Sequence, residues 1–348
     1  MKAHVVMLGC IAVMAAIFAS CAKKATNDYW PAKEWRTTEP GKVRMDAKGL
    51  EEIDAYVRST RLDVSSVLVV RHGYIVFERY YHGGSDTLRS INQETPSVLS
   101  ALIGVAIEQG LIESVDQPMI DFFPENEIIR SDPLVDKITI RHLLTMSDGI
   151  ITAGNMIEFY FSDPKLSKKL KTDPGSRFRH NGISPYILSM ILRKATGLKS
   201  LDFGRKHLFE PLGITNVVWH ELKGDSRGLY GLMLTTRDMA KIGYLYLKKG
   251  IWNNEQVIPQ EWVSESTRSQ IATGESSAYR KDYGYCWWIY TFGAYPGYFA
   301  FGWRGQLICV VPELDLVAVL TTHAFGTEGG ERPYFTIAEK YILGSVKK

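Results

Sequence analysis

The chain has 348 residues, of which 45% are hydrophobic and 23% are charged. This composition excludes a disordered chain, and the length is enough to bury a large core, in one domain with two lobes or in two domains. The net charge is only +3 and the lysine and arginine residues are spread rather than clustered, so a nucleic-acid partner is not indicated.

The N-terminus carries the pattern of a secretion signal. Lys2 precedes an apolar run over residues 5–18 that is too short to span a bilayer comfortably, and two small residues lead to Cys21. We interpret residues 1–20 as a bacterial lipoprotein signal that is cleaved before Cys21, whose thiol would carry the lipid. An uncleaved anchor with a free thiol is the alternative. The predicted location is therefore the bacterial cell envelope, with the chain anchored to a membrane and facing the periplasm or the exterior.

Residues 21–45 are polar, contain Pro31 and Pro40 and show no apolar periodicity, so we expect a tether between the anchor and the domain. The domain would begin at Asp46, which can cap a helix because apolar residues follow it at helical spacing. Two β-rich runs come next and meet at His72 and Gly73. A glycine at the turn between such runs predicts an antiparallel hairpin.

Residues 90–112 predict a buried helix. Residues 98–107 are nearly all apolar, so the helix is expected to face protein on most sides. Pro96 fixes its own φ and disfavours a helical Thr95, which predicts Thr95 as the N-cap and Pro96 as the first helical residue. Gly110 predicts the end of the helix.

This stretch resembles the serine β-lactamase-related family, which comprises class C β-lactamases, DD-peptidases, family VIII carboxylesterases and amide-oligomer hydrolases. In that family the helix opens with Ser-x-Thr-Lys-Ser, in which the first serine is acylated and the lysine three positions later takes its proton. Aligning Thr95 and Ser97 with the family's threonine and second serine places Gln93 at the nucleophile and Pro96 at the base. An amide is not a useful nucleophile and proline has no basic side chain, so the resemblance implies a degenerate site.

Residues from about 116 to 235 resemble the mostly helical lobe of the same family. Two positions after Phe178 the family has a tyrosine that shuttles protons to the leaving group, and this chain has His180. An imidazole is a competent base, which leaves a rebuilt site open; the alternative is a retained ring without chemistry. The family's following asparagine falls on Gly182, with Asn181 one position away.

The last third predicts antiparallel strands and then a helix from Glu331 to about Leu343. Residues 302–306, GWRGQ, stand where the family has its third motif, and Trp303 and Gly305 fit the Trp-x-Gly variant of the carboxylesterases. The resemblance implies that this strand edge lines the acyl site and supplies one oxyanion-hole N–H. The alternative is that the glycines and the aromatic residue only shape a strand edge.

Cys286 and Cys309 are the cysteines that remain after the signal and Cys21. Each lies in an apolar run typical of a strand. An oxidising compartment would allow a disulfide between them, and two ordinary buried thiols are the equal alternative.

Other side chains do not restore the missing chemistry. Ser97 lies one turn deeper on the same helix face, but the family keeps a serine there beside its catalytic one, and Ser90 has no neighbouring base. The eight histidines show no ligand spacing, so no metal is predicted, and no cofactor is expected.

The predicted fold class is α/β over residues 46–345: a β-lactamase and penicillin-binding-protein-like antiparallel sheet, flanked by helices, with an inserted helical lobe. The predicted function is an envelope lipoprotein that has lost catalysis and keeps a cleft for a cell-wall peptide or small acyl ligand. Aromatic residues would line this cleft: Trp287, Trp288, Tyr298 and Trp303. The alternatives are an active ester or amide hydrolase with a rearranged site that uses His180, and a purely structural lipoprotein.

Overall fold

The computed structural model describes residues 30–31, 34–124, 134–150, 172–303, 305–323 and 330–347. The predicted signal and the predicted lipidation site, Cys21, lie outside these ranges. No helix within them is long and apolar enough to cross a membrane.

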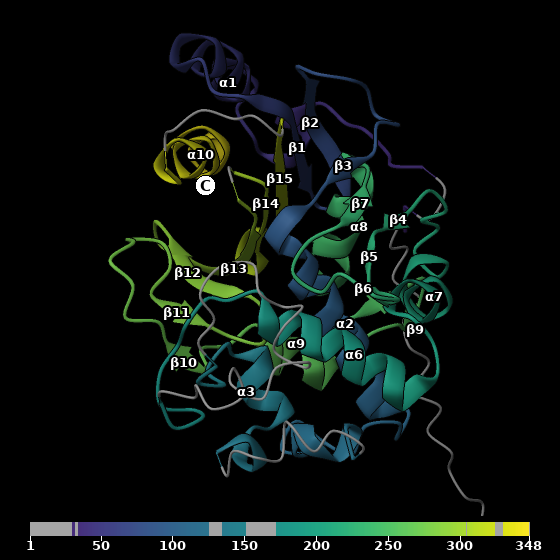
Figure 1. Ribbon diagram of the computed structural model, residues 1–348. Coiled ribbons are helices and arrows are strands. Elements are labelled where there is room, and N and C mark those ends of the chain that lie inside the picture. The colour runs from purple at the N-terminus through teal and green to yellow at the C-terminus, as the bar shows by residue number, and fades with distance from the viewer. Residues whose placement is uncertain are drawn as a thin grey trace, which may run out of the picture.

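An antiparallel sheet forms the centre of the described chain (Figure 1). Its strands are β1 (Val64–Arg71), β2 (Tyr74–Tyr80), β10 (Ile271–Ala272), β11 (Asp282–Tyr283), β12 (Trp288–Phe292), β13 (Tyr295–Phe301), β14 (Leu307–Val311) and β15 (Leu316–Thr322). They run in the order β10-β11-β12-β13-β14-β15-β1-β2, so that the first hairpin joins the last strand through β1. The predicted hairpin is confirmed, because β1 and β2 pair and both turn residues, His72 and Gly73, have positive φ.

The residues of the central strands alternate between two cores. On β1, Leu68 and Val70 face a first core, whereas Val67 and Val69 face a second. Helices α2 (Thr95–Glu108) and α8 (Thr236–Leu247) belong to the first core. Helices α1 (Ala47–Thr60) and α10 (Arg332–Thr336), the latter continued by helical turns to Ser345, belong to the second. The predicted α/β arrangement, an antiparallel sheet with helices on both faces, is therefore confirmed.

The chain between α2 and α8 forms the helical lobe, which packs beside α2 (Figure 1). Its helices are α3 (Ile140–Leu144), α6 (Ile183–Thr196) and α7 (Ser200–Gly204). Its short strands are β4 (Val218–Trp219), β5 (Glu221–Leu222), β6 (Asp225–Ser226) and β7 (Leu232–Leu234), and β7 pairs with β4 and with β3 (Arg89–Ser90), just before α2. After α8 come β8 (Ile251–Trp252), β9 (Glu255–Gln256) and α9 (Gln260–Ser266).

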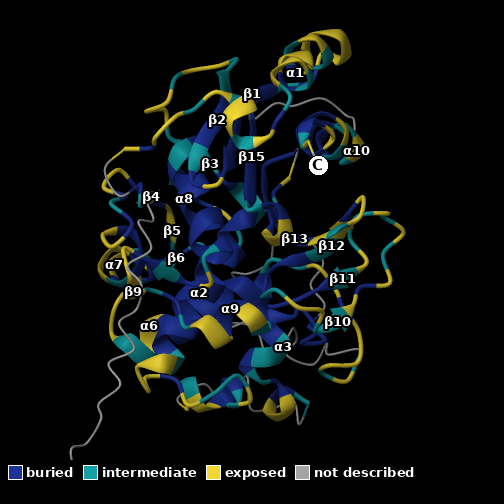
Figure 2. Ribbon diagram, turned by 180° about the vertical axis from the view of Figure 1, so that it is seen from behind, coloured by how far each residue is buried: buried dark blue, intermediate teal, exposed yellow. Residues whose placement is uncertain are grey.

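Helix α2 is buried from Thr95 to Ala106, as the apolar run predicts, and Figure 2 shows it among the dark blue elements at the centre of the molecule. The predicted N-cap is wrong by one residue. A short 3-10 turn, Asn92–Glu94, leads directly into α2, so Thr95 is already helical and its hydroxyl donates to the Asn92 carbonyl at 2.7 Å. Pro96 tolerates this because a proline in the first turn needs no N–H partner.

Side chains cap the starts of helices α1 and α8. Asp46 caps α1, because its carboxylate accepts the Gly49 N–H at 3.1 Å. Helix α8 is capped by Thr235, whose hydroxyl oxygen accepts the Asp238 N–H at 3.1 Å. Thr236 lies inside the helix, where its hydroxyl bonds that of Ser66 in β1 at 2.8 Å.

The last part of the predicted tether, residues 34–45, lies against the domain. Thr37 bridges Ile75 of β2, and the indole N–H of Trp35 donates to the Arg237 carbonyl at 3.2 Å. Trp35 and Trp30 also pack against the ring of Tyr244, on α8. The packed region therefore begins ahead of Asp46.

Cys286 and Cys309 are both free and buried. Cys286 belongs to the first core and Cys309, on β14, to the second. Since the sheet separates the two cores, the thiols face different surroundings. Of the two alternatives, a pair of ordinary buried thiols is the one observed.

Candidate functional site

The turn before α2 positions Gln93, the residue that the sequence predicts at the nucleophile position. Asn92 has a φ of 46°, a left-handed conformation that asparagine tolerates better than most residues. Its side-chain oxygen accepts the Ser90 hydroxyl at 3.0 Å, and its amide donates weakly to the Trp303 carbonyl at 3.5 Å. The sharp turn brings Gln93 to face the loop between β13 and β14.

Gln93 is bonded to that loop. Its side-chain oxygen accepts the backbone N–H of Trp303, 210 positions along the chain. The side chain at the nucleophile position thus joins the start of α2 to the third motif. This contact uses the amide as an acceptor, a role that a serine hydroxyl is too short to fill in the same way.

The third motif is a tight connection between β13 and β14. Gly302 lies so close to the turn that an added Cβ would stand 2.9 Å from the Ile91 carbonyl oxygen. Gly305 has a φ of +109°, and an added Cβ would stand 2.3 Å from the ring of Tyr334. Both glycines are therefore required for the close approach of this loop to its neighbours. Trp303 projects outward and is 62% exposed.

The base position offers no chemistry. Pro96 is buried in the first turn of α2. Ser97, the serine one turn deeper, donates its hydroxyl to the Cys286 carbonyl at 2.6 Å. The Ser90 hydroxyl bonds within its own turn, to the side chain and the backbone N–H of Asn92. Within the part of the chain that the structure describes, neither of these hydroxyls is hydrogen-bonded to a basic side chain, so neither has the partner that activates a nucleophile.

His180 stacks on Trp288, with ring centroids 6.2 Å apart and planes 15° from parallel. Although part of His180 is exposed, the protein around the ring lowers its pKa to about 4, first by keeping water from it and second through the positive charge of Arg280. The imidazole is therefore neutral at pH 7 and is a weaker base than an ordinary histidine.

Asn181 is occupied as a helix cap. Its side-chain oxygen accepts the backbone N–H groups of Ile183 and Ser184, each at 2.8 Å, next to Gly182 at the start of α6. The fully buried Asp148 supports this arrangement by accepting the Ser184 hydroxyl and the Ile150 N–H. Burial raises the pKa of Asp148, and these donors counter the rise.

Glu94, immediately after Gln93, is fully buried, and neither of its carboxyl oxygens has a hydrogen-bond partner among the described residues. Burial raises its pKa well above the ordinary value, an effect that the nearby Ile308 backbone amide offsets only in part. The sequence gives little warning of this, because the position falls between a polar loop and an apolar helix. Such surroundings favour the protonated form of the carboxyl.

The expected aromatic lining is wrong at two positions. Trp287 is fully buried and Tyr298 nearly so, and both pack in the first core around Tyr246. Trp288 is also buried and reaches the site only through its stack with His180. Among the four predicted residues, Trp303 is the one that is exposed.

Within the described ranges, no three His, Cys, Asp or Glu side chains are grouped as a metal site requires. The site joins Gln93 to the Trp303 loop and places His180 on Trp288. Amide and backbone groups of this kind can bind a ligand through hydrogen bonds, but they do not form a nucleophile and base pair.

The antiparallel sheet, the inserted helical lobe and the buried helix α2 define a protein with the fold of the β-lactamase-related serine hydrolases. A model of the Beta-lactamase family matches residues 51–340, and the chain belongs to that family. The chain is 27% identical to an uncharacterised protein of Alkalihalophilus pseudofirmus over 305 residues, 76% of this chain and 85% of that protein.

Two further proteins are similar over most of their length. The 6-aminohexanoate-dimer hydrolase of Paenarthrobacter ureafaciens is 21% identical over 304 residues, which are 80% of this chain and 77% of the hydrolase. The structure of an octameric penicillin-binding protein homologue from Pyrococcus abyssi superimposes with a TM-score of 0.72 at 20% identity, covering 86% of this chain and 78% of that one. The structural likeness agrees with the predicted fold.

Proposed function

We propose that this protein is a member of the β-lactamase family that binds a ligand without hydrolysing it. The observation that carries the proposal is the bond between the Gln93 side-chain oxygen and the Trp303 N–H. This bond turns the nucleophile position into a structural link between two walls of the site. Pro96, buried at the position of the base, leaves no group to activate a nucleophile.

The ligand class that the site supports is a peptide, a muropeptide fragment or a small acyl compound. Trp303 offers an exposed aromatic face, and His180 offers a neutral imidazole. We also propose that Cys21 carries a lipid and holds the protein at a membrane of the cell envelope. The polar stretch after an apolar N-terminal run supports this location.

The first test is intact-protein mass spectrometry after exposure to a fluorophosphonate and, separately, to a penicillin. We expect no covalent adduct from protein whose folding is checked by circular dichroism, because acylation needs an activated nucleophile. A class C β-lactamase treated in parallel controls the reagents. A stoichiometric adduct would overturn the proposal, and mapping it would identify the reactive side chain.

The Gln93→Ser variant is expected to stay unreactive toward the same two reagents. The new hydroxyl would lie in the 3-10 turn ahead of α2, with a proline where the base belongs. Adduct formation by this single variant would mean that another base reaches residue 93. Gln93→Ser combined with His180→Phe would then show whether His180 is that base.

The rearranged hydrolase is the second candidate, and the exposed, neutral imidazole of His180 favours it. It predicts slow ester turnover that is lost in His180→Phe. Because the His180 pKa is about 4, this turnover would fall only as the pH drops through about 4, where the imidazole becomes protonated. Turnover that persists in His180→Phe would exclude this role.

A further inference from the structure

A cavity lies beside the candidate site. It has a volume of about 550 Å³, within the range typical of small-molecule sites. The start of β1, the loop before β3, the Trp303 loop and the end of β15 form its walls. Asn92 and Trp303 are shared with the candidate site, but Gln93, Pro96 and His180 do not line the cavity.

The charges around this cavity favour an anion. Arg89, in its wall, is buried, and its guanidinium donates to the backbone carbonyls of residues 82, 84 and 87, with no carboxylate among its hydrogen-bond partners. His82 and His323 also line it, with ring centroids 5.9 Å apart. No lining residue is acidic. Asp63 stands 3.8 Å from the His82 ring, and Asp86 acts on Arg89 from the exposed loop.

Two buried polar atoms in the wall lack partners. Gln306 is 2% exposed and Thr322 is 6% exposed, yet the Gln306 side-chain oxygen and the Thr322 hydroxyl make no hydrogen bond with the described residues. The other end of Gln306 is fixed, since its Nε2 donates to the Thr322 carbonyl at 3.3 Å. The free oxygen therefore presents an acceptor that needs an N–H or O–H group, and an unpaired buried polar atom is costly.

We propose that this cavity binds a small amide-bearing carboxylate, such as an N-acyl amino acid. The carboxylate lies in the positive field of Arg89, and the rings of His82 and His323 stand in the same wall. The amide N–H donates to the Gln306 side-chain oxygen, and the acyl carbonyl accepts the Thr322 hydroxyl. Leu88, Met233 and the Trp303 ring supply apolar surface for the side chain. Binding in this cavity is separate from the proposed function, because Gln93 does not line the cavity.

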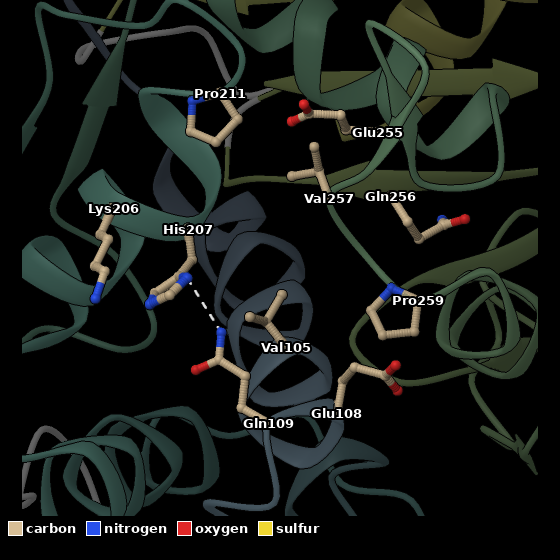
Figure 3. Close-up of a pocket in the computed structure, with 10 residues that line it drawn as sticks. All are labelled: Val105, Glu108, Gln109, Lys206, His207, Pro211, Glu255, Gln256, Val257 and Pro259. Atoms are coloured by element: carbon tan, nitrogen blue, oxygen red, sulfur yellow. Dashed lines mark hydrogen bonds between the residues drawn. The ribbon is translucent and has the colours of Figure 1, made fainter.

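A cavity of about 280 Å³ elsewhere in the molecule offers a contrast (Figure 3). Figure 3 shows the carboxylates of Glu108 and Glu255 among its lining residues, and Gln109 bonded to the ring of His207 at 3.1 Å. Both of its glutamines, Gln109 and Gln256, already have hydrogen-bond partners, and its two glutamates outnumber its one lysine, Lys206. An acidic amide has no reason to prefer it, so Gln109 provides the matched control for Gln306.

The test is isothermal titration calorimetry of the full-length protein with three probes: N-acetyl-leucine, N-acetyl-leucinamide and isocaproate. We expect N-acetyl-leucine to bind at least about tenfold more tightly than the amide, which lacks the charge, or isocaproate, which lacks the N–H. Equal binding of all three, or no binding of N-acetyl-leucine, would overturn the proposal. If the cavity holds only water, N-acetyl-leucine will not bind.

Variants locate the binding. Gln306→Glu is expected to abolish binding of N-acetyl-leucine by charge repulsion, and Gln109→Glu to leave it unchanged. Thr322→Val and the exposed substitution His82→Gln, which are safer for folding, should each weaken it several-fold. If neither of these two changes the affinity, the ligand binds elsewhere and the proposal fails. A covalent adduct in the mass-spectrometric test would overturn only the proposed lack of hydrolysis.

Discussion

Glu94→Met is expected to raise the free energy of unfolding by about 2 to 4 kcal/mol at pH 7. The Glu94 carboxyl is fully buried and its oxygens lack partners in the described chain, so folding must remove it from water without replacing its hydrogen bonds. Methionine fills a similar volume without a polar group and adapts to irregular surroundings. Urea denaturation of both proteins measures the difference.

The gain in the free energy of unfolding from Glu94→Met should depend on pH. The unfolded glutamate ionises near its ordinary pKa of 4.5, whereas the folded one stays protonated well above it. Between these two pKa values the folded state binds more protons, so the unchanged protein loses stability as the pH rises, by at most about 1.4 kcal/mol per pH unit. The advantage of Glu94→Met should therefore grow from pH 4 upward.

The exposed Glu113, changed to methionine, controls for the loss of a charge and should show no such trend. A decrease in stability on Glu94→Met, at every pH, would show that the carboxyl has a favourable partner in solution. In that case the start of α2 would be held together by a polar contact and not merely by packing.

Gly305→Ala is expected to destabilise the protein by about 3 kcal/mol or more, for two reasons that add. Its φ of +109° is strained for any residue with a side chain, and the new methyl group would overlap the ring of Tyr334. Thermal and chemical denaturation measure the loss. Any relief of the overlap must move the third-motif loop away from Tyr334, which also disturbs the bond to Gln93.

Gly293→Ala separates the two causes. Gly293, in the turn between β12 and β13, also has a positive φ, +61°, but nothing lies within 4 Å of an added Cβ. We expect a cost of only about 1 kcal/mol there. In a Tyr334→Ala background the cost of Gly305→Ala should shrink toward the same value. Equal costs for both glycines in the unchanged background would contradict the predicted overlap.

The sheet and its two cores were open to prediction because strand periodicity is local. Alternating apolar residues on β1 and β14 place successive side chains on opposite faces, so a run in which every residue is apolar indicates a strand covered on both sides. The burial of α2 was predictable for the same reason, since its residues are apolar around the whole helix.

Helix starts were less predictable. Thr95 and Thr236 both have capping chemistry, but backbone geometry decides whether it is used, and each is one residue inside its helix. The turn at Asn92–Glu94 extends the helical winding before Pro96. A local rule about residues before proline gives way here to the packing of that turn against the third motif.

The candidate site was predictable only in part. Motif alignment predicts that Gln93 and Pro96 replace the catalytic residues, but the surroundings of these two positions come from distant segments. The contact between Gln93 and Trp303 spans 210 positions. The cavity near Gln306 combines residues of β1 and β15, the first and the last strands of the sheet in sequence order. Asp148 carried a weak signal, because an aspartate followed by glycine after a short helix is typical of a turn that fixes its neighbours.

The packing of Trp30 and Trp35 against α8 limits how far the protein stands above a membrane. On the proposal that Cys21 carries the lipid, nine residue steps separate the anchor from Trp30. A fully extended chain covers about 3.5 Å per step, so the domain stays within about 30 Å of the bilayer surface. The protein would then act at the level of the lipid headgroups and the adjacent cell-wall layer. Its short tether would keep it from reaching the rest of the envelope.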